Sequence, residues 1–126
     1  MTKTLVFRGV ATALITPLTE NGVDYEALGR LIDWQIEQGI NALVIAGTTG
    51  EGATLSDEEH RQVLRYSIER VAGRVPVIAG TGSNDTHYAV SLTRYACELG
   101  ADALLVATPY YNKATQNGLV QMDRTI

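Results

Sequence analysis

Residues 39–46, GINALVIA, and residues 100–107, GADALLVA, are two copies of one pattern, and this pattern decides the fold class. Four of the eight positions are identical. A looser copy, GRVPVIAG, occupies residues 73–80, and the apolar run VATALI occupies residues 10–15. Continuous apolar runs are typical of parallel strands that helices cover. The pattern therefore predicts four parallel strands, near residues 10–15, 41–46, 76–79 and 103–107.

Helix signals fill the segments between these strands. Asp24 is a candidate N-cap, and Ser56 with Glu59 has the S-x-x-E form of a capping box. Asn84 is a candidate cap for a third helix, which would turn Cys97 inward. The resulting βαβαβαβ order predicts an α/β fold with right-handed crossovers. It does not separate an open doubly wound sheet from a barrel.

The composition narrows the possible partners. The chain has 126 residues, 45% hydrophobic and 19% charged, which argues against disorder and predicts one domain. The chain has ten Lys and Arg residues and fourteen Asp and Glu residues. Because the basic residues are scattered along the sequence, no basic face for nucleic acid is expected. No secretory signal is visible, and no apolar run approaches the roughly 20 residues that cross a bilayer. The lone Cys97 is expected as a buried thiol in a reducing compartment. We therefore expect a cytoplasmic protein without a membrane or nucleic-acid partner.

Functional groups of parallel α/β folds gather where the strands end. The turn after the second strand is GTTGEG, residues 47–52, in which Thr48 and Thr49 offer hydroxyl and backbone N–H groups. Such groups suit a carboxylate or a phosphate. The alternative is an ordinary tight turn. The spacing fits neither G-x-G-x-x-G nor a P-loop, so a nucleotide site is poorly supported.

The turn after the fourth strand, TPYYN at residues 108–112, carries two adjacent tyrosines. Tyr110 and Tyr111 point in different directions, so that one can enter a site while the other packs at an interface. A tyrosine hydroxyl next to a threonine hydroxyl would form a proton relay. The alternative is surface packing. His60 and His87 have no neighbours at metal-ligand spacing, so no metal is expected.

Together these turns resemble the 4-hydroxy-tetrahydrodipicolinate synthase (dihydrodipicolinate synthase) family of pyruvate-dependent class I aldolases. The resemblance runs from about residue 7 to residue 121. It rests on ALITP (13–17), GTTGE (47–51), VIAGTG (77–82) and TPYYN (108–112), in order and correctly spaced. N-acetylneuraminate lyase and related aldolases share the fold and the G-x-T-G-E pattern, and they remain an alternative.

The resemblance implies a (β/α)8 TIM barrel in which a lysine Schiff base of pyruvate attacks L-aspartate 4-semialdehyde in lysine and diaminopimelate biosynthesis, with no further cofactor. Thr48 would belong to a proton relay, and Tyr111 would reach the neighbouring subunit's site in a homo-oligomer. Thr49 would hold the pyruvate carboxylate. Positions matching a lysine effector site are Ala53, His60, Asn84 and Tyr110. Gly52, Asp57 and Tyr88 replace polar or acidic residues of lysine-sensitive members, which argues against feedback inhibition.

The family's second relay tyrosine and its Schiff-base lysine would both lie beyond residue 126. The two lysines present, Lys3 and Lys113, lie outside the predicted strands, where a desolvated nucleophilic amine is expected. We therefore expect residues 1–126 to form a single incomplete domain, the N-terminal half of the barrel, inactive by itself. Residues 122–126 are expected to depart from the family pattern.

Two other hypotheses remain open at this stage. The first is a non-catalytic half-barrel that self-associates or binds a full-length subunit, because four strands leave two unpaired edges. The second is an open-sheet anion-binding domain unrelated to aldolases.

Overall fold

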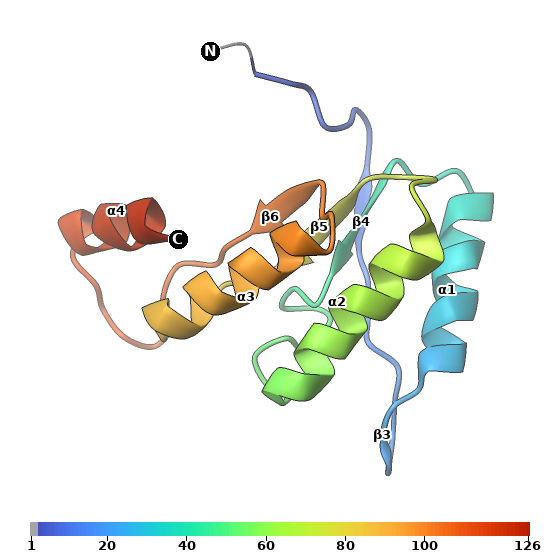
Figure 1. Cartoon of the computed structure of the whole chain (residues 1–126), viewed down its shortest axis with the longest axis horizontal. Coiled ribbons are helices and arrows are strands. Elements are labelled where there is room, and N and C mark those ends of the chain that lie inside the picture. Colours follow the sequence, from blue (N-terminus) through green and yellow to red (C-terminus); the bar gives the residue numbers. More distant parts are fainter. Residues whose placement is uncertain (1–2) are drawn as a thin grey trace.

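A computed structural model describes residues 3–126 and contains a parallel sheet with helices on one side (Figure 1). The sheet has the order β1-β4-β5-β6. Its strands are β1 (Ala11–Ala13), β4 (Ala42–Ile45), β5 (Val77–Gly80) and β6 (Ala103–Leu105). All three pairings are parallel. The four strands and their parallel pairing are as the apolar runs predicted.

Four helices alternate with the strands. They are α1 (Tyr25–Glu37), α2 (Asp57–Val71), α3 (Thr86–Glu98) and α4 (Gln116–Thr125). Asp24 caps α1, and Ser56 and Glu59 form the reciprocal capping box of α2. Both caps are confirmed. The helix α4 continues through most of residues 122–126, whose departure from the family pattern stays a prediction.

Two local predictions about α3 are wrong. Its N-cap is Asp85, whose carboxylate accepts from the N–H groups of His87 and Tyr88. Asn84 is not free to cap, because its side chain binds the backbone of Tyr110. Cys97 is exposed, since it lies about a quarter turn from the buried stripe that includes Leu92.

A short antiparallel hairpin follows β1 and was not predicted. It pairs β2 (Leu18–Thr19) with β3 (Gly22–Val23). The dipeptide Asn21-Gly22, which favours tight hairpin turns, was the available signal. Gly22 has a φ of +117°, a conformation that glycine adopts without strain.

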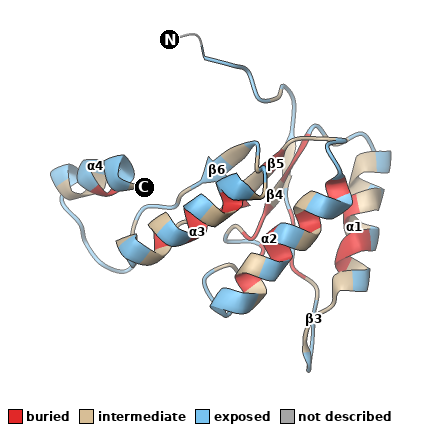
Figure 2. Cartoon of the chain, in the orientation of Figure 1, coloured by how far each residue is buried: buried red, intermediate tan, exposed pale blue. Residues whose placement is uncertain are grey.

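The core lies between the sheet and the helices α1, α2 and α3 (Figure 2). The row of Leu43 and Val77 is buried there, as are Ile45 and Ala79 in the row two residues on. The salt bridges of Asp33 on α1 with Arg70 and Arg74 join α1 to α2 and to the turn that follows α2. These hydrogen bonds lower the pKa of Asp33 to about 2. None of the helices in the described part of the chain is long and apolar enough to cross a membrane.

Candidate functional site

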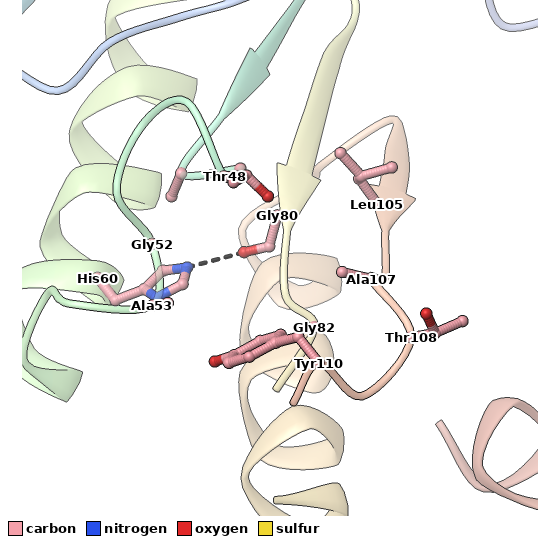
Figure 3. Close-up of a pocket in the computed structure, with 12 residues that line it drawn as sticks. Thr48, Gly52, Ala53, His60, Gly80, Gly82, Leu105, Ala107, Thr108 and Tyr110 are labelled. Atoms are coloured by element: carbon pink, nitrogen blue, oxygen red, sulfur yellow. Dashed lines mark hydrogen bonds between the residues drawn. The ribbon is translucent and has the colours of Figure 1, made fainter. Parts of the chain in front are cut away.

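The turns after β4, β5 and β6 enclose a cavity of about 310 Å³ at the carboxyl end of the sheet (Figure 3). The cavity is lined by backbone and side chains from all three turns and from α2. Its lining residues are Ala46, Gly47, Thr48, Gly52, Ala53, His60, Gly80, Gly82, Leu105, Ala107, Thr108 and Tyr110. Strand-end turns therefore meet where the parallel sheet predicted a site.

The turn after β4 is held in a fixed shape by its own backbone. Gly52 N–H donates to Gly47 O at 3.1 Å, and Glu51 N–H donates to Thr48 O at 3.0 Å. The buried Thr16 hydroxyl, from the segment after β1, donates to Gly50 O at 2.6 Å. Both threonines of this turn are exposed, but Thr48 lines the cavity and Thr49 does not.

Backbone strain is concentrated in this turn. Ala46 and Glu51 have φ values of +54° and +59°, which side-chain-bearing residues rarely adopt. Each such residue costs on the order of 1–3 kcal/mol, and strain of this kind clusters at functional sites. The strained turn is therefore a candidate for ligand contact on grounds independent of its sequence motif.

The turn after β5 approaches its neighbours too closely for any side chain. A Cβ on Gly80 would lie 2.3 Å from Ala46 O, and one on Gly82 would lie 2.5 Å from Ala107 N. These two glycines let the three turns converge. Nothing in the local sequence of residues 80–82 indicates how close this approach is.

His60 on α2 forms one wall of the cavity. It is buried, and its Nε2 donates to Gly80 O at 2.7 Å (Figure 3). Burial lowers the pKa of the His60 imidazole below 6.5, and the backbone carbonyl hydrogen bond opposes this. The ring therefore favours the neutral form with its proton on Nε2. Within residues 3–126, no three His, Cys, Asp or Glu residues form a group able to hold a metal.

Asn84 fixes the turn after β6. Its Nδ2 donates to Tyr110 O, and its Oδ1 accepts from Tyr110 N–H, both at 2.8 Å. The Tyr110 ring lines the cavity, and the next residue points elsewhere. Tyr111 is 99% exposed and has a φ of +69°. The two tyrosines thus differ in environment, as the sequence predicted.

The structure brings together some of the predicted site residues and separates others. Thr48, Ala53, His60 and Tyr110 line one cavity, and Asn84 contributes by holding Tyr110. Thr49 and Tyr111 lie outside its lining. Thr16, which anchors the strained turn, was missed as a site residue, although the Thr-Pro pair after the first strand was visible.

Three positions, Gly52, Asp57 and Tyr88, were expected to weigh against a lysine effector. Gly52 is part of the lining. Asp57 and Tyr88 are neighbours, and burial, with the Asp57 carboxylate next in effect, raises the pKa of the Tyr88 phenol. The Tyr88 hydroxyl therefore remains protonated at neutral pH.

Comparison with known proteins decides the family. The family model described as "Dihydrodipicolinate synthetase family" matches residues 6–126. This chain belongs to the dihydrodipicolinate synthetase family. A curated relative, 4-hydroxy-tetrahydrodipicolinate synthase of Acetivibrio thermocellus, is 60% identical over 121 residues. That match covers 96% of this chain and 41% of the relative, so the chain spans about two-fifths of the relative's length.

Solved structures of dihydrodipicolinate synthases agree with the described fold. The Acinetobacter baumannii enzyme in complex with pyruvate is 50% identical, with a TM-score of 0.91, over 95% of this chain and 41% of that chain. The Cyanidioschyzon merolae enzyme with lysine bound is 42% identical, with a TM-score of 0.86, over 92% and 40% of the two chains. The fold is therefore the N-terminal half of a TIM barrel, which resolves the choice between barrel and open sheet and removes the open-sheet anion-binding domain.

Proposed function

We propose that this chain supplies the turns that hold pyruvate and relay protons in a 4-hydroxy-tetrahydrodipicolinate synthase. The reaction joins pyruvate, as a lysine Schiff base, to L-aspartate 4-semialdehyde. One observation carries the proposal. The strained turn with Thr48 and the turn with Tyr110 and Tyr111 line the same cavity at the carboxyl end of the sheet. The names of the relatives favour this reaction over that of an N-acetylneuraminate lyase-like aldolase.

Each residue has a distinct proposed role. The Thr48 hydroxyl can accept a proton on one side and donate one on the other, as a relay requires. The exposed Thr49, with the backbone N–H groups of its turn, would hold the pyruvate carboxylate. Tyr111, fully exposed on a strained backbone, is suited to reach the site of a neighbouring subunit in a homo-oligomer.

A chimera tests the proposal. Residues 6–121 of this chain would replace the matching segment of the Acetivibrio thermocellus enzyme, and synthase activity with both substrates would be measured. We expect an active chimera whose kcat falls roughly 10²–10⁴-fold with Thr48→Val. Thr19→Val, an exposed threonine on the β2–β3 hairpin, is the matched control and should leave kcat unchanged. An active chimera that tolerates Thr48→Val would refute the relay.

The Schiff base needs an amine that we expect from outside these residues. Lys3 lies near the chain start and Lys113 in the exposed turn before α4, neither on a strand. Both side chains are exposed, whereas a Schiff-base lysine needs an amine in a desolvated site. Treating the 126-residue chain with pyruvate and borohydride should leave its intact mass unchanged, and a stable adduct would contradict this part of the proposal.

The cavity is also our candidate for the effector pocket, because Ala53, His60 and Tyr110 line it. We expect weak lysine binding. A lysine ammonium requires nearby acceptors, and Tyr88 offers a neutral hydroxyl where lysine-sensitive members have a polar or acidic residue. In the chimera, Tyr88→Glu should lower the lysine concentration needed for half-inhibition. Equal sensitivity of the chimera with and without this substitution would count against the assignment.

A further inference from the structure

A buried threonine after β1 reaches the turn that carries Thr48. Thr16 is 6% exposed, and its hydroxyl donates to Gly50 O at 2.6 Å. Buried polar groups in folded proteins almost always have such a partner, and here the partner lies 34 residues along the chain. A Cβ on Gly50 would lie 3.0 Å from Leu14 O, so the turn also rests directly on this segment. The segment after β1 is therefore a support of the turn after β4.

The peptide unit between Gly50 and Glu51 is held at both of its polar ends. Its carbonyl accepts from the Thr16 hydroxyl, and its N–H donates to Thr48 O at 3.0 Å. A peptide unit is planar, so fixing the direction of its C=O also fixes the direction of its N–H. The Thr16 hydroxyl therefore acts on the backbone of Thr48 through a single rigid plane.

The same peptide unit has a second orientation in which the backbone is less strained. Glu51 has a φ of +59°, which residues with a side chain rarely adopt. Turning the peptide unit by half a rotation would bring this φ to about −120°, inside the broad β region. Gly50 tolerates the accompanying change in its own ψ, because it has no Cβ. That rotation would break both hydrogen bonds of the peptide unit, so the observed orientation depends on an anchor.

The segment that carries Thr16 is itself fixed on both sides. Before it, Leu14 N–H donates to Val44 O of β4 at 3.0 Å. After it, Asp24 N–H, at the start of α1, donates to Pro17 O at 2.9 Å. The ring of Pro17 also restricts its φ. The Thr16 hydroxyl is therefore mounted on a backbone that two elements of the fold hold in place.

We propose that Thr16 is a positioning residue for the synthase reaction. It holds the peptide unit between Gly50 and Glu51, and through that unit it holds the Thr48 hydroxyl at the cavity. The inference rests on the relay role proposed for Thr48. Thr16 does not line the cavity, so its effect on the reaction passes through the turn. A displacement of about 1 Å at a reacting group can lower a rate about 100-fold, so a small movement of the turn suffices.

Two substitutions that differ by one hydroxyl test the proposal in the synthase chimera described above. Thr16→Ala should lower kcat about 10–100-fold, because the peptide unit loses its anchor. Thr16→Ser keeps the donor and should retain most of the activity. Thr12→Ala is the matched control on β1, since it removes a hydroxyl that donates to Gln35 Oε1 of α1 at 2.9 Å, and it should leave kcat unchanged. Equal losses in the alanine and serine variants of Thr16, or a Thr16→Ala effect no larger than that of Thr12→Ala, would overturn the proposal.

A double-mutant cycle with Thr48→Val separates positioning from a general loss of stability. If Thr16 acts through Thr48, adding Thr16→Ala to the Thr48→Val chimera should lower kcat by no more than about twofold further. Effects that multiply would show that Thr16 acts by another route, which would overturn the proposal. Circular dichroism would check that each variant is folded. If the alanine variant does not fold, Thr16→Val, which keeps the side-chain volume and also lacks the donor, takes its place in the cycle.

Amide exchange of residues 47–52 in the chimera gives a readout that does not depend on the relay. Thr16→Ala should speed exchange in this segment about tenfold, because the Glu51 N–H loses its fixed direction towards Thr48 O. Thr16→Ser and Thr12→Ala should leave it unchanged. If Thr48→Val keeps its kcat, the relay proposal fails by itself, and exchange then decides the role of Thr16. Unchanged exchange in Thr16→Ala would overturn the inference, whereas faster exchange would support Thr16 as the anchor of the turn.

Discussion

The strands β4 and β6 arise from nearly the same eight-residue pattern but differ in burial. Leu43 in β4 is fully buried, whereas Leu104, at the equivalent position in β6, is 38% exposed. The next residues differ similarly, since Val44 is half-buried and Leu105 is 48% exposed. Within residues 3–126, the strand β4 has β1 and β5 as neighbours, and β6 has β5 alone. Burial is therefore set by the neighbours of a strand, and the local pattern does not determine it.

Truncating the two equivalent leucines should give the largest difference between the strands. Leu43→Ala should lower the free energy of unfolding by about 2–5 kcal/mol, because it leaves a cavity in the core. Leu104→Ala should cost less than about 1 kcal/mol, because its side chain contacts water on one side. Urea denaturation at low chain concentration measures both. Equal losses would mean that β6 is covered as fully as β4.

Asn84 tests how far the turn after β6 depends on hydrogen bonds instead of packing. Asn84→Ala removes two hydrogen bonds to the Tyr110 backbone, worth about 0.5–1.5 kcal/mol each. We expect faster amide exchange throughout residues 108–112 and no change in β4. Asn84→Asp keeps the acceptor and should give an intermediate effect. Unchanged exchange in the alanine variant would show that packing holds the turn.

Acid should lower the free energy of unfolding by protonating Asp33 of α1, which pairs with Arg70 and Arg74. Its folded-state pKa of about 2 lies below the ordinary value of 3.8, so it stabilises the fold above about pH 4. This contribution should be lost as the pH falls from about 4 towards 2. Asp33→Asn should flatten the pH dependence of the unfolding free energy in that range. Glu26→Gln, which removes an exposed pair with Arg30, should not flatten it.

Of these substitutions, Tyr111→Gly should change the free energy of unfolding least, and it should stabilise the fold. The φ of +69° at this position is strained for tyrosine, whereas glycine adopts it without strain. Because its side chain is fully exposed, Tyr111→Gly removes no packing and should raise the unfolding free energy by up to about 1 kcal/mol. In the synthase chimera the same substitution should lower kcat. A loss of stability would show that the ring packs within the chain.

Local sequence signals predicted the elements because they act over a few residues. The capping box of Ser56 and the apolar runs need no information from distant segments, and both were confirmed. The role of Asn84 was missed because its partner, Tyr110, lies 26 residues away. Cys97 was misplaced because a small error in helix phase moves a residue at the border of the buried stripe to the surface.

The site was predictable as a set of turns but not as a cavity. Parallel topology alone brings the turns after β4, β5 and β6 to one end of the sheet. The contact of Thr16 with Gly50, and the close approach of Gly80 to Ala46, depend on the packing of several strands at once. The positive φ of Ala46 could not be predicted either, because alanine usually avoids positive φ.

Amide exchange of two equivalent residues tests the account most directly. Leu43 N–H donates to Pro76 O at 3.1 Å. Thr81 N–H donates to Leu105 O, so by alternation the Leu104 N–H points away from β5. We predict that the Leu43 amide is protected and that the Leu104 amide exchanges much faster. Protection of Leu104 equal to that of Leu43 would contradict the account.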